Sequence, residues 1–402
     1  GENLNIDIKK ELVHPNSLGM LYSALTTYAG FNANGGEGKV MALADYGVPE
    51  YYEELTKIIK IHEDGSFKID TSYFDFDSGN TMFTSKFVKK FGEPCRGLNY
   101  IEKRHFDMAA SLQKLTETIL LKTITNAATE YNMKNLCAAG GVFLNCVTNA
   151  KILKETPIEN IFVQPAAGDA GGALGAAFYL HNSVLKNPRS FVMDSAKLGP
   201  EFTDEYIKKM LEEKKIDYIY FEHEKSMLDT VCQYIAENKI VGWFQGKMEF
   251  GPRALGARSI LANAANPDMK DYLNQKVKHR EWFRPYGISI LENHLKDFFD
   301  TDYKNQYMLV TGNALAGTKE KIPSAVHIDG SSRYQTVSEN DGIYFRLIQN
   351  FYKLTGLPLI INTSFNDNTE PVVCTPEHAL NCYLSTDIDV LVMGKCIVKK
   401  KF

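Results

Sequence analysis

The run most suited to phosphate chemistry is WFQGKMEFGPRALGARSIL at 243–261, which sets two arginines in a turn rich in glycine and proline. The planar guanidinium of Arg253 or Arg258 can bind two phosphate oxygens at once. Gly251 and Gly256 leave the backbone open to a ligand. The alternative is that both arginines form surface salt bridges. The constrained GPRALG turn leaves them little freedom to lie on a solvated face, so the run favours a phosphate site.

A second basic run, QKVKHREWFRPYG at 275–287, combines cations with aromatic rings. Its members are Lys276, Lys278, Arg280, Arg284, Trp282 and Phe283. Such a mixture could bind single-stranded nucleic acid, or the phosphates and adenine ring of a nucleotide. It could also be the solvated end of a basic helix. Because the run is short and the formal net charge of the chain is −4, a nucleotide is the preferred ligand and no nucleic-acid partner is expected.

Two later segments add polar side chains that suit ligand binding. HIDGSSRYQTV at 327–337 contains His327, Asp329 and Arg333. INTSFNDNTEPVV at 361–373 places Asn362, Thr363 and Ser364 at the end of an expected strand. Ligands of α/β proteins bind outside strand ends. The alternative is that Asn-Thr-Ser forms only a turn.

Glycines and one aspartate mark a separate candidate site nearer the start of the chain. Gly140, Gly141 and Asn145 follow an expected strand, and Asp169 lies in GDAGG at 168–172, before an expected helix. Glycines after a strand let the backbone approach a phosphate or ribose. Tight packing and a helix cap are the alternatives. Since the chain has no HxxxH pair, a self-contained histidine metal site has no support.

Periodicity predicts the elements that must position these residues. We expect a strand in the polar opening at 1–15, helices at 17–31 (capped by Ser17) and 107–132, a buried strand opening 135–145, and strand–loop–helix at 161–180. After a polar stretch at 183–205, we expect helices at 204–214, 226–239 and 374–386, strands at 240–245 and 357–366, and a closing hairpin. This alternation predicts an α/β fold with two domains, 1–195 and 196–402.

Composition narrows the class of protein. The 402 residues include seven cysteines, an odd number without a CxxC pair, so a disulfide framework or zinc ribbon is not expected and a cytoplasmic location is. No apolar stretch approaches the length of about 18 residues that a membrane-spanning helix needs, and no signal peptide is visible.

The motifs resemble those of the O-carbamoyltransferases of nodulation-factor, aminoglycoside and cephamycin pathways. The matching stretches include QPAAGDAGGALGAA, FGPRALGARSIL, KVKHREWFRPYGISIL, HIDGSSRYQTV and LPLIINTSFNDNTEPVV. The resemblance implies that 1–195 is part of an actin-like (ASKHA), metal-dependent carbamoyl-transfer domain. It implies that 196–402 is a YrdC-like domain that makes carbamoyl-adenylate from carbamoyl phosphate and ATP, with Mg(II) accompanying the ATP. The acceptor would be a hydroxyl of a small molecule.

The resemblance also assigns roles to residues. The catalytic candidates are Arg253, Lys278, Arg333 and Ser364. The candidates for binding nucleotide or carbamoyl-adenylate are Gly140, Gly141, Asn145, Arg258, Arg280, Arg284 and Asn362. Asp169 would be one ligand of an Fe(II)-like divalent metal.

The chain departs from the family at its start. Family members carry an earlier segment with two metal-binding histidines spaced HxxxH, and this chain has none. Because the sequence opens on Gly1 rather than methionine, we expect a truncated or processed product, or a separate chain that supplies those histidines. A homo-oligomer is compatible with the sequence. Two other functions stay open: a tRNA-modifying carbamoyl transferase, and an inactive structural subunit of a split enzyme.

Overall fold

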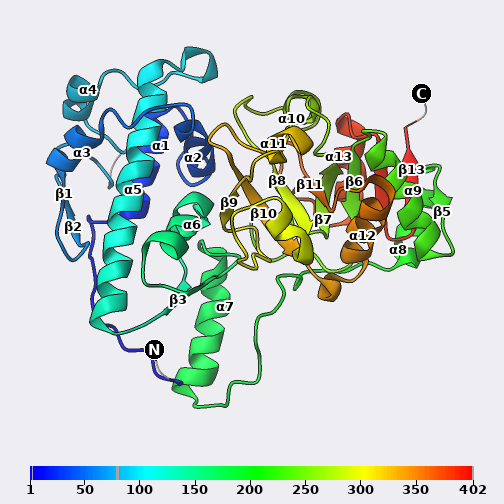
Figure 1. Cartoon of the computed structure of the whole chain (residues 1–402), viewed down its shortest axis with the longest axis horizontal. Coiled ribbons are helices and arrows are strands. Elements are labelled where there is room, and N and C mark those ends of the chain that lie inside the picture. Colours follow the sequence, from blue (N-terminus) through cyan, green and yellow to red (C-terminus); the bar gives the residue numbers. More distant parts are fainter. Residues whose placement is uncertain (2, 78–80, 401–402) are drawn as a thin grey trace. The chain divides into compact units, whose positions relative to one another are not determined.

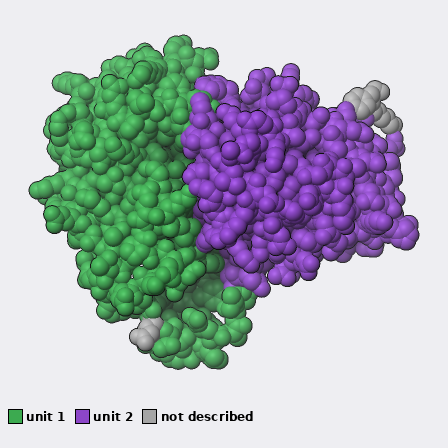
Figure 2. Space-filling model, viewed as in Figure 1, with its two compact units in different colours: residues 1–192 green, residues 193–402 purple. Residues whose placement is uncertain are grey.

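The computed structural model describes residues 1, 3–77 and 81–400. The chain forms two compact units, Gly1–Val192 and Met193–Phe402 (Figure 2). Both mix helices with strands, as the sequence predicted for an α/β protein. The assignment of 1–195 to an actin-like domain and of 196–402 to a YrdC-like domain stays a prediction. None of the helices in the described residues is long and apolar enough to cross a membrane.

Unit 1 is organised around one long helix, α5 (Lys103–Glu130), which confirms the helix predicted at 107–132 but begins four residues and ends two residues earlier. Its buried Met108, Leu112, Leu115 and Ile119 recur at helical spacing and form one packing face. The other α-helices are α1 (Leu18–Tyr28), α2 (Glu37–Ala44), α3 (Tyr52–Ile58), α4 (Ser85–Phe91), α6 (Cys146–Glu155) and α7 (Ala170–Phe178). As predicted, Ser17 caps α1, because its hydroxyl accepts the Met20 N–H at 3.2 Å.

The strands of unit 1 are short and form two separate pairs. Strand β1 (Ile59–Ile61) runs antiparallel to β2 (Phe67–Ile69), and β3 (Asn135–Ala138) runs parallel to β4 (Asn160–Val163). Short helical turns complete the unit: η1 (Leu98–Tyr100), η2 (Gly141–Leu144) and η3 (Tyr179–Val184). The predicted opening strand was wrong: residues 6–13 form no strand, and Ile6 and Ile8 are exposed, because no strand among the described residues pairs with this segment. Strand β3 exists but is largely exposed, not buried as predicted.

Unit 2 is built on one mixed sheet of nine strands in the order β5-β13-β12-β6-β7-β11-β8-β10-β9. The strands are β5 (Ile219–Tyr220), β6 (Val241–Phe244), β7 (Arg258–Ala262), β8 (Gly287–Leu291), β9 (Thr311–Asn313), β10 (Ser331–Val337), β11 (Leu359–Ser364), β12 (Val390–Met393) and β13 (Cys396–Lys399). Strand β10 runs parallel to β8, and β12 parallel to β6. The predicted strands at 240–245 and 357–366 and the closing hairpin are confirmed as β6, β11 and β12–β13.

Helices cover both faces of this sheet (Figure 1). Helices α9 (Glu224–Ala236) and α12 (Ile343–Thr355) pack on one face, and α8 (Asp204–Glu213) and α13 (Pro376–Ser385) on the other. The remaining helical segments are α10 (Met269–Tyr272), η4 (Leu273–Val277), η5 (Glu292–Asp297), α11 (Thr318–Lys321) and η6 (Glu339–Asp341). Because both faces are covered, the central strands β6, β7, β8 and β12 are buried along their whole length.

Candidate functional site

The sheet of unit 2 brings motifs that are far apart in the sequence to one edge, where the ends of neighbouring strands meet. Strands β7, β8 and β10 begin at this edge, and the antiparallel β11 ends there. The register pairs Ser364 with Ser259, and Asn362 with Gly287. Tyr334 pairs with Ile288, which puts Arg333 beside Gly287. Four motifs that are far apart in the sequence therefore meet where four neighbouring strands begin or end.

The loop that carries Arg253 is held around a buried carboxylate. One oxygen of Glu249 accepts the N–H groups of Leu255 and Ala257, each at 2.7 Å, and the other accepts that of Arg258 at 3.1 Å. Gly256 has a φ of 96°, and a Cβ there would overlap the Tyr344 ring, so only glycine fits. The loop is thus fixed in one conformation, with Arg253 half-buried.

Arg258 has a different environment, although it lies in the same motif. Its side chain is fully buried, and the guanidinium donates to the carbonyl oxygens of Gln245, Gly246, Ala257 and Pro200, each at 3.1 Å. The guanidinium carbon also lies 3.6 Å from the centre of the Phe244 ring. Burial lowers the pKa of Arg258 to about 10. This geometry fits a structural role and leaves no exposed surface for a phosphate, so the predicted contact of Arg258 with a nucleotide does not fit this placement.

Lys278 ties the second basic run to the end of β11. The side chain is only 3% exposed. Its ammonium donates to the carbonyl oxygens of Ser364 at 2.8 Å and Asn366 at 2.6 Å, and to their side-chain oxygens at 3.3 and 2.7 Å. Burial lowers the pKa of Lys278 well below its ordinary value, and the charges of Arg280 and Arg284 lower it further. Lys278 therefore positions Ser364 and the turn that follows it.

Three arginines add positive charge around this end of the strands, which we call the positive edge. Arg280 donates to Asn274 at 2.8 Å, and its guanidinium lies 4.4 Å from the centre of the Tyr286 ring. Burial and the charge of Arg280 lower the pKa of Arg284 to about 10, and Arg333 adds to this effect while Glu281 opposes it. Since cations so placed repel one another, this edge is suited to a ligand with several negative charges.

Asn362 lies beneath this edge, not on its surface. Its side chain is fully buried, and its amide nitrogen donates to the Ala254 carbonyl at 3.1 Å and to the Ser289 hydroxyl at 2.9 Å. The predicted contact with a nucleotide does not fit this placement, because these donor contacts are made within the protein. Asn362 instead connects β11 to the loop that carries Arg253.

In unit 1, the glycine turn and Asn145 lie next to one another. Gly140 has a φ of 105°, a conformation that favours glycine. Its N–H donates at 2.7 Å to the carbonyl oxygen of Ala167, the residue just before the GDAGG loop. Asn145 is buried and caps α6, because its side-chain oxygen accepts the Thr148 N–H at 3.1 Å. A cap role accounts for Asn145 without a ligand, whereas Gly140 and Gly141 leave backbone accessible.

Asp169 stands at the start of α7 and is exposed, with no side-chain hydrogen bond that caps the helix. Asp169 belongs to no group of three histidine, cysteine or acidic side chains, among the described residues, that lie close enough together to share a metal ion. Catalytic metals are usually held by about three protein ligands. Within the residues that the structure describes, Asp169 alone therefore does not make a metal site.

Comparison with known proteins identifies the family. Family models described as carbamoyltransferase N-terminus and carbamoyltransferase C-terminus match residues 2–178 and 232–400. Nodulation protein NolO of Bradyrhizobium diazoefficiens is 34% identical over 96% of this chain and 69% of its own length. This chain belongs to the carbamoyltransferase family.

Two further relatives match most of this chain. An uncharacterised Synechocystis protein is 39% identical, and nodulation protein NolNO of Sinorhizobium fredii 35%. The alignments cover 97% and 96% of this chain, but 68% and 56% of those proteins. A structure of full-length HypF in its phosphate- and nucleotide-bound form aligns with a TM-score of 0.32 and 16% identity, over 46% of this chain and 23% of that one. That likeness is too weak to bear on the fold.

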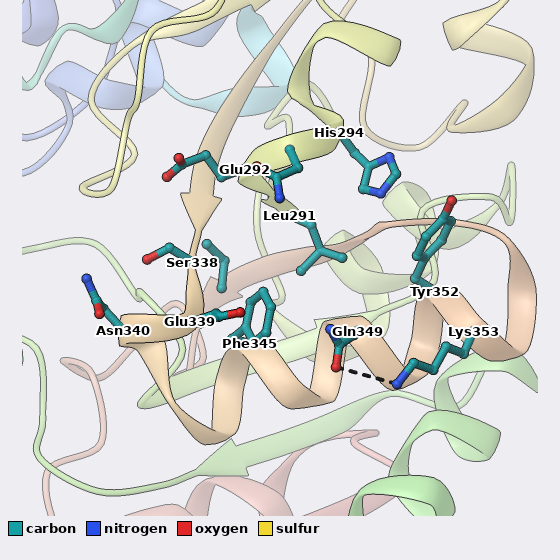
Figure 3. Close-up of a pocket in the computed structure, with 12 residues that line it drawn as sticks. Leu291, Glu292, His294, Ser338, Glu339, Asn340, Phe345, Gln349, Tyr352 and Lys353 are labelled. Carbon is teal, nitrogen blue, oxygen red and sulfur yellow. Dashed lines mark hydrogen bonds between the residues drawn. The ribbon is translucent and has the colours of Figure 1, made fainter.

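A cavity of about 480 Å³ lies at the other end of the same strands in this carbamoyltransferase chain (Figure 3). Leu291 and Val337, the last residues of the parallel strands β8 and β10, lie in its lining. The ring centres of His294 and Tyr352 lie 4.6 Å apart there, with the ring planes inclined by 59°. None of the candidate catalytic or binding residues lines this cavity, so the positive edge and the cavity are separate features of the sheet.

Sequence reasoning missed Glu249, Ser289 and Gln335, which hold the loop that carries Arg253. A signal for one of them was present. Ser289 interrupts the otherwise apolar strand GISIL, whereas Gln335 lies among other polar residues in SSRYQTV. A polar side chain in such a strand must find a partner inside the protein.

Proposed function

We propose that unit 2 makes carbamoyl-adenylate from carbamoyl phosphate and ATP, and that the carbamoyl group then passes to a hydroxyl of a small molecule. The observation that carries the proposal is the gathering of Lys278, Arg280, Arg284 and Arg333 at one sheet edge of a carbamoyltransferase, with the Arg253 loop joined to that edge. Carbamoyl phosphate and ATP bring many negative charges together, and fixed cations stabilise such an arrangement.

The steps of adenylate formation suggest what these residues do. Water cleaves carbamoyl phosphate into carbamate and phosphate. An oxygen of carbamate then attacks the α-phosphorus of ATP, and the bond from that phosphorus to the β-phosphate oxygen breaks, so that pyrophosphate leaves. Negative charge accumulates on the phosphoryl oxygens and the leaving group. Arg253 and Arg333 are suited to bind these oxygens, whereas Lys278 holds the Ser364 turn beside them.

The first test measures both products. The 402-residue chain, mixed with ATP, Mg²⁺ and carbamoyl phosphate, should release pyrophosphate and phosphate in equal amounts. Omitting either substrate should abolish pyrophosphate release, because the attacking carbamate or the adenylate donor is then absent. A folded chain that binds ATP but releases no pyrophosphate would refute adenylate formation by this chain.

For unit 1, we propose that further polypeptide completes the transfer site. Helix α7 and the η3 turn contain no buried residue, and Tyr179, Leu180 and Val184 are each 53% exposed. A mostly apolar helix with no buried residue is suited to pack against another segment. The exposed Asp169 begins this helix, so a segment that covers α7 could also bring metal ligands to Asp169.

Metal content tests this idea. The 402-residue chain alone should bind little iron, because one exposed carboxylate holds a divalent ion weakly. Adding the histidine-bearing N-terminal segment of a relative should give about one ion per chain, as one site with about three protein ligands requires. Asp169→Ala should then lose that ion, whereas Asp77→Ala, which removes an exposed carboxylate elsewhere in unit 1, should keep it. Stoichiometric iron held by the chain alone through Asp169 would overturn the proposal.

A further inference from the structure

On the face of the unit 2 sheet that α9 and α12 cover, the buried side chains change from apolar to polar toward the positive edge. Away from that edge, its strands carry the buried apolar residues Leu261, Ile360, Leu291 and Val337. Nearer the edge, the same four strands carry Ser259, Asn362, Ser289 and Gln335, which are at most 1% exposed. Four neighbouring strands thus place polar side chains inside the protein, where burial is unfavourable unless each group is hydrogen-bonded.

Three of these side chains bind one another. The Ser289 hydroxyl donates to the Gln335 side-chain oxygen at 2.7 Å. The Asn362 amide nitrogen donates to the Ser289 hydroxyl at 2.9 Å and to the Gln335 oxygen at 3.1 Å. The hydroxyl of the fully buried Tyr344 on α12 also donates to Ser289, at 2.8 Å. We call Ser289, Gln335 and Asn362 the polar triad.

The polar triad binds the loop that carries Arg253. The Gln335 amide nitrogen donates to the Leu255 carbonyl at 3.1 Å, and that of Asn362 to the Ala254 carbonyl at 3.1 Å. These are the two residues that directly follow Arg253. The backbone of the loop is therefore held by side chains from two strands, β10 and β11, which Ser289 on β8 connects, in addition to its bonds with Glu249.

We propose that the polar triad consists of positioning residues, which fix the backbone after Arg253 and so hold its guanidinium where phosphate charge develops. The proposal rests on the proposed formation of carbamoyl-adenylate. Binding the transition state well requires cations that are already in place, because reorganisation during the reaction raises the barrier. Apolar residues at these positions would stabilise the sheet but would leave the two loop carbonyls without partners.

The central variant is Gln335→Met, which keeps a side chain of similar length and removes the donor to Leu255. The loop loses its bond from Gln335, and Ser289 and Asn362 lose the oxygen acceptor that they share, so pyrophosphate formation should slow by roughly three- to tenfold. The decisive comparison is with Arg253→Ala. If Gln335 acts through Arg253, Gln335→Met should have little further effect in a chain that already lacks the guanidinium, and the two effects should not multiply.

Ile290→Val is the matched control. Ile290 follows Ser289 on β8 and packs on the opposite face of the sheet, so the substitution perturbs the core without touching the polar triad. Its effect on the rate should be small and should multiply with that of Arg253→Ala. Amide exchange at Leu255–Ala257 should accelerate in Gln335→Met and not in Ile290→Val.

The outcomes separate the two proposals. If the wild-type chain forms no pyrophosphate, the proposed function fails, and amide exchange alone then decides whether the triad fixes the loop. If the wild-type chain is active but the effects of Gln335→Met and Arg253→Ala multiply in folded variants, the positioning role is refuted. Unchanged amide exchange in Gln335→Met would refute it as well.

Discussion

Arg253→Ala is expected to slow pyrophosphate formation by roughly 30- to 1000-fold, since one charge-assisted contact to a transition state is worth about 2–4 kcal/mol. The fold should survive, because the loop around Arg253 is held by the Glu249 carboxylate and by Asn362 through bonds to other residues. Arg253→Lys should recover only part of the rate, since an ammonium group cannot bind two oxygens in one plane. Steady-state release of pyrophosphate measures both effects.

Arg346→Ala provides the control for loss of a positive charge. Arg346 lies exposed on α12 and pairs with Glu224 at 2.6 Å, and exposed pairs of this kind contribute little to stability. The variant should keep near-native turnover. Near-native turnover in Arg253→Ala as well would show that the GPRALG turn is structural and that its arginine binds no substrate.

The elements that the sequence predicted well are those whose signals are local. Helix α13 begins as its residues required, with Thr375 accepting the His378 N–H at 3.3 Å and Pro376 in the first turn. Strands β6 and β11 are buried apolar runs bounded by polar residues. The opening segment failed, because alternation of Ile6 and Ile8 says nothing about whether a partner strand exists.

The candidate site shows a sharper limit. Arg253 and Arg258 lie five positions apart in one motif and are equally suited to phosphate by residue type. Their environments differ because Arg258 opens β7 and is enclosed by the Pro200 carbonyl and the Phe244 ring. Pro200 comes from another segment of the chain, and Phe244, although it lies in the motif, meets Arg258 only through the register of β6 with β7. The sequence therefore identified arginines suited to bind phosphate, whereas packing determines which of the two is accessible to a ligand.

The role of Lys278 was also outside the reach of sequence. Its neighbours Lys276 and Arg280 look alike as cations, but Lys276 is exposed and Lys278 is buried against the turn after β11. A basic run indicates a concentration of charge. Whether a given member of the run faces a ligand or packs inside the protein depends on how the chain folds after η4.

The second large effect is expected from Lys278→Met, which keeps the length of the side chain and removes its charge. Pyrophosphate formation should fall by a factor on the order of 100, because the Ser364 turn loses its support beside the reacting phosphates. The free energy of unfolding should drop by about 1–3 kcal/mol, since the oxygen acceptors on Ser364 and Asn366 lose their shared donor. Lys276→Met, two residues away and exposed, should change neither quantity appreciably.

The pH dependence gives an independent check on Lys278. Folding lowers its pKa well below the ordinary value of 10.5, so between those two pKa values the unfolded chain binds more protons at this position than the folded one. Stability from this group then rises with pH, is complete above 10.5, and is lost as the pH falls through the folded pKa. The difference in unfolding free energy between wild type and Lys278→Met, measured with urea, should widen from neutral pH toward 10.5. A difference that narrows would mean that folding raises the pKa of Lys278 and that the folded protein favours its charged ammonium form.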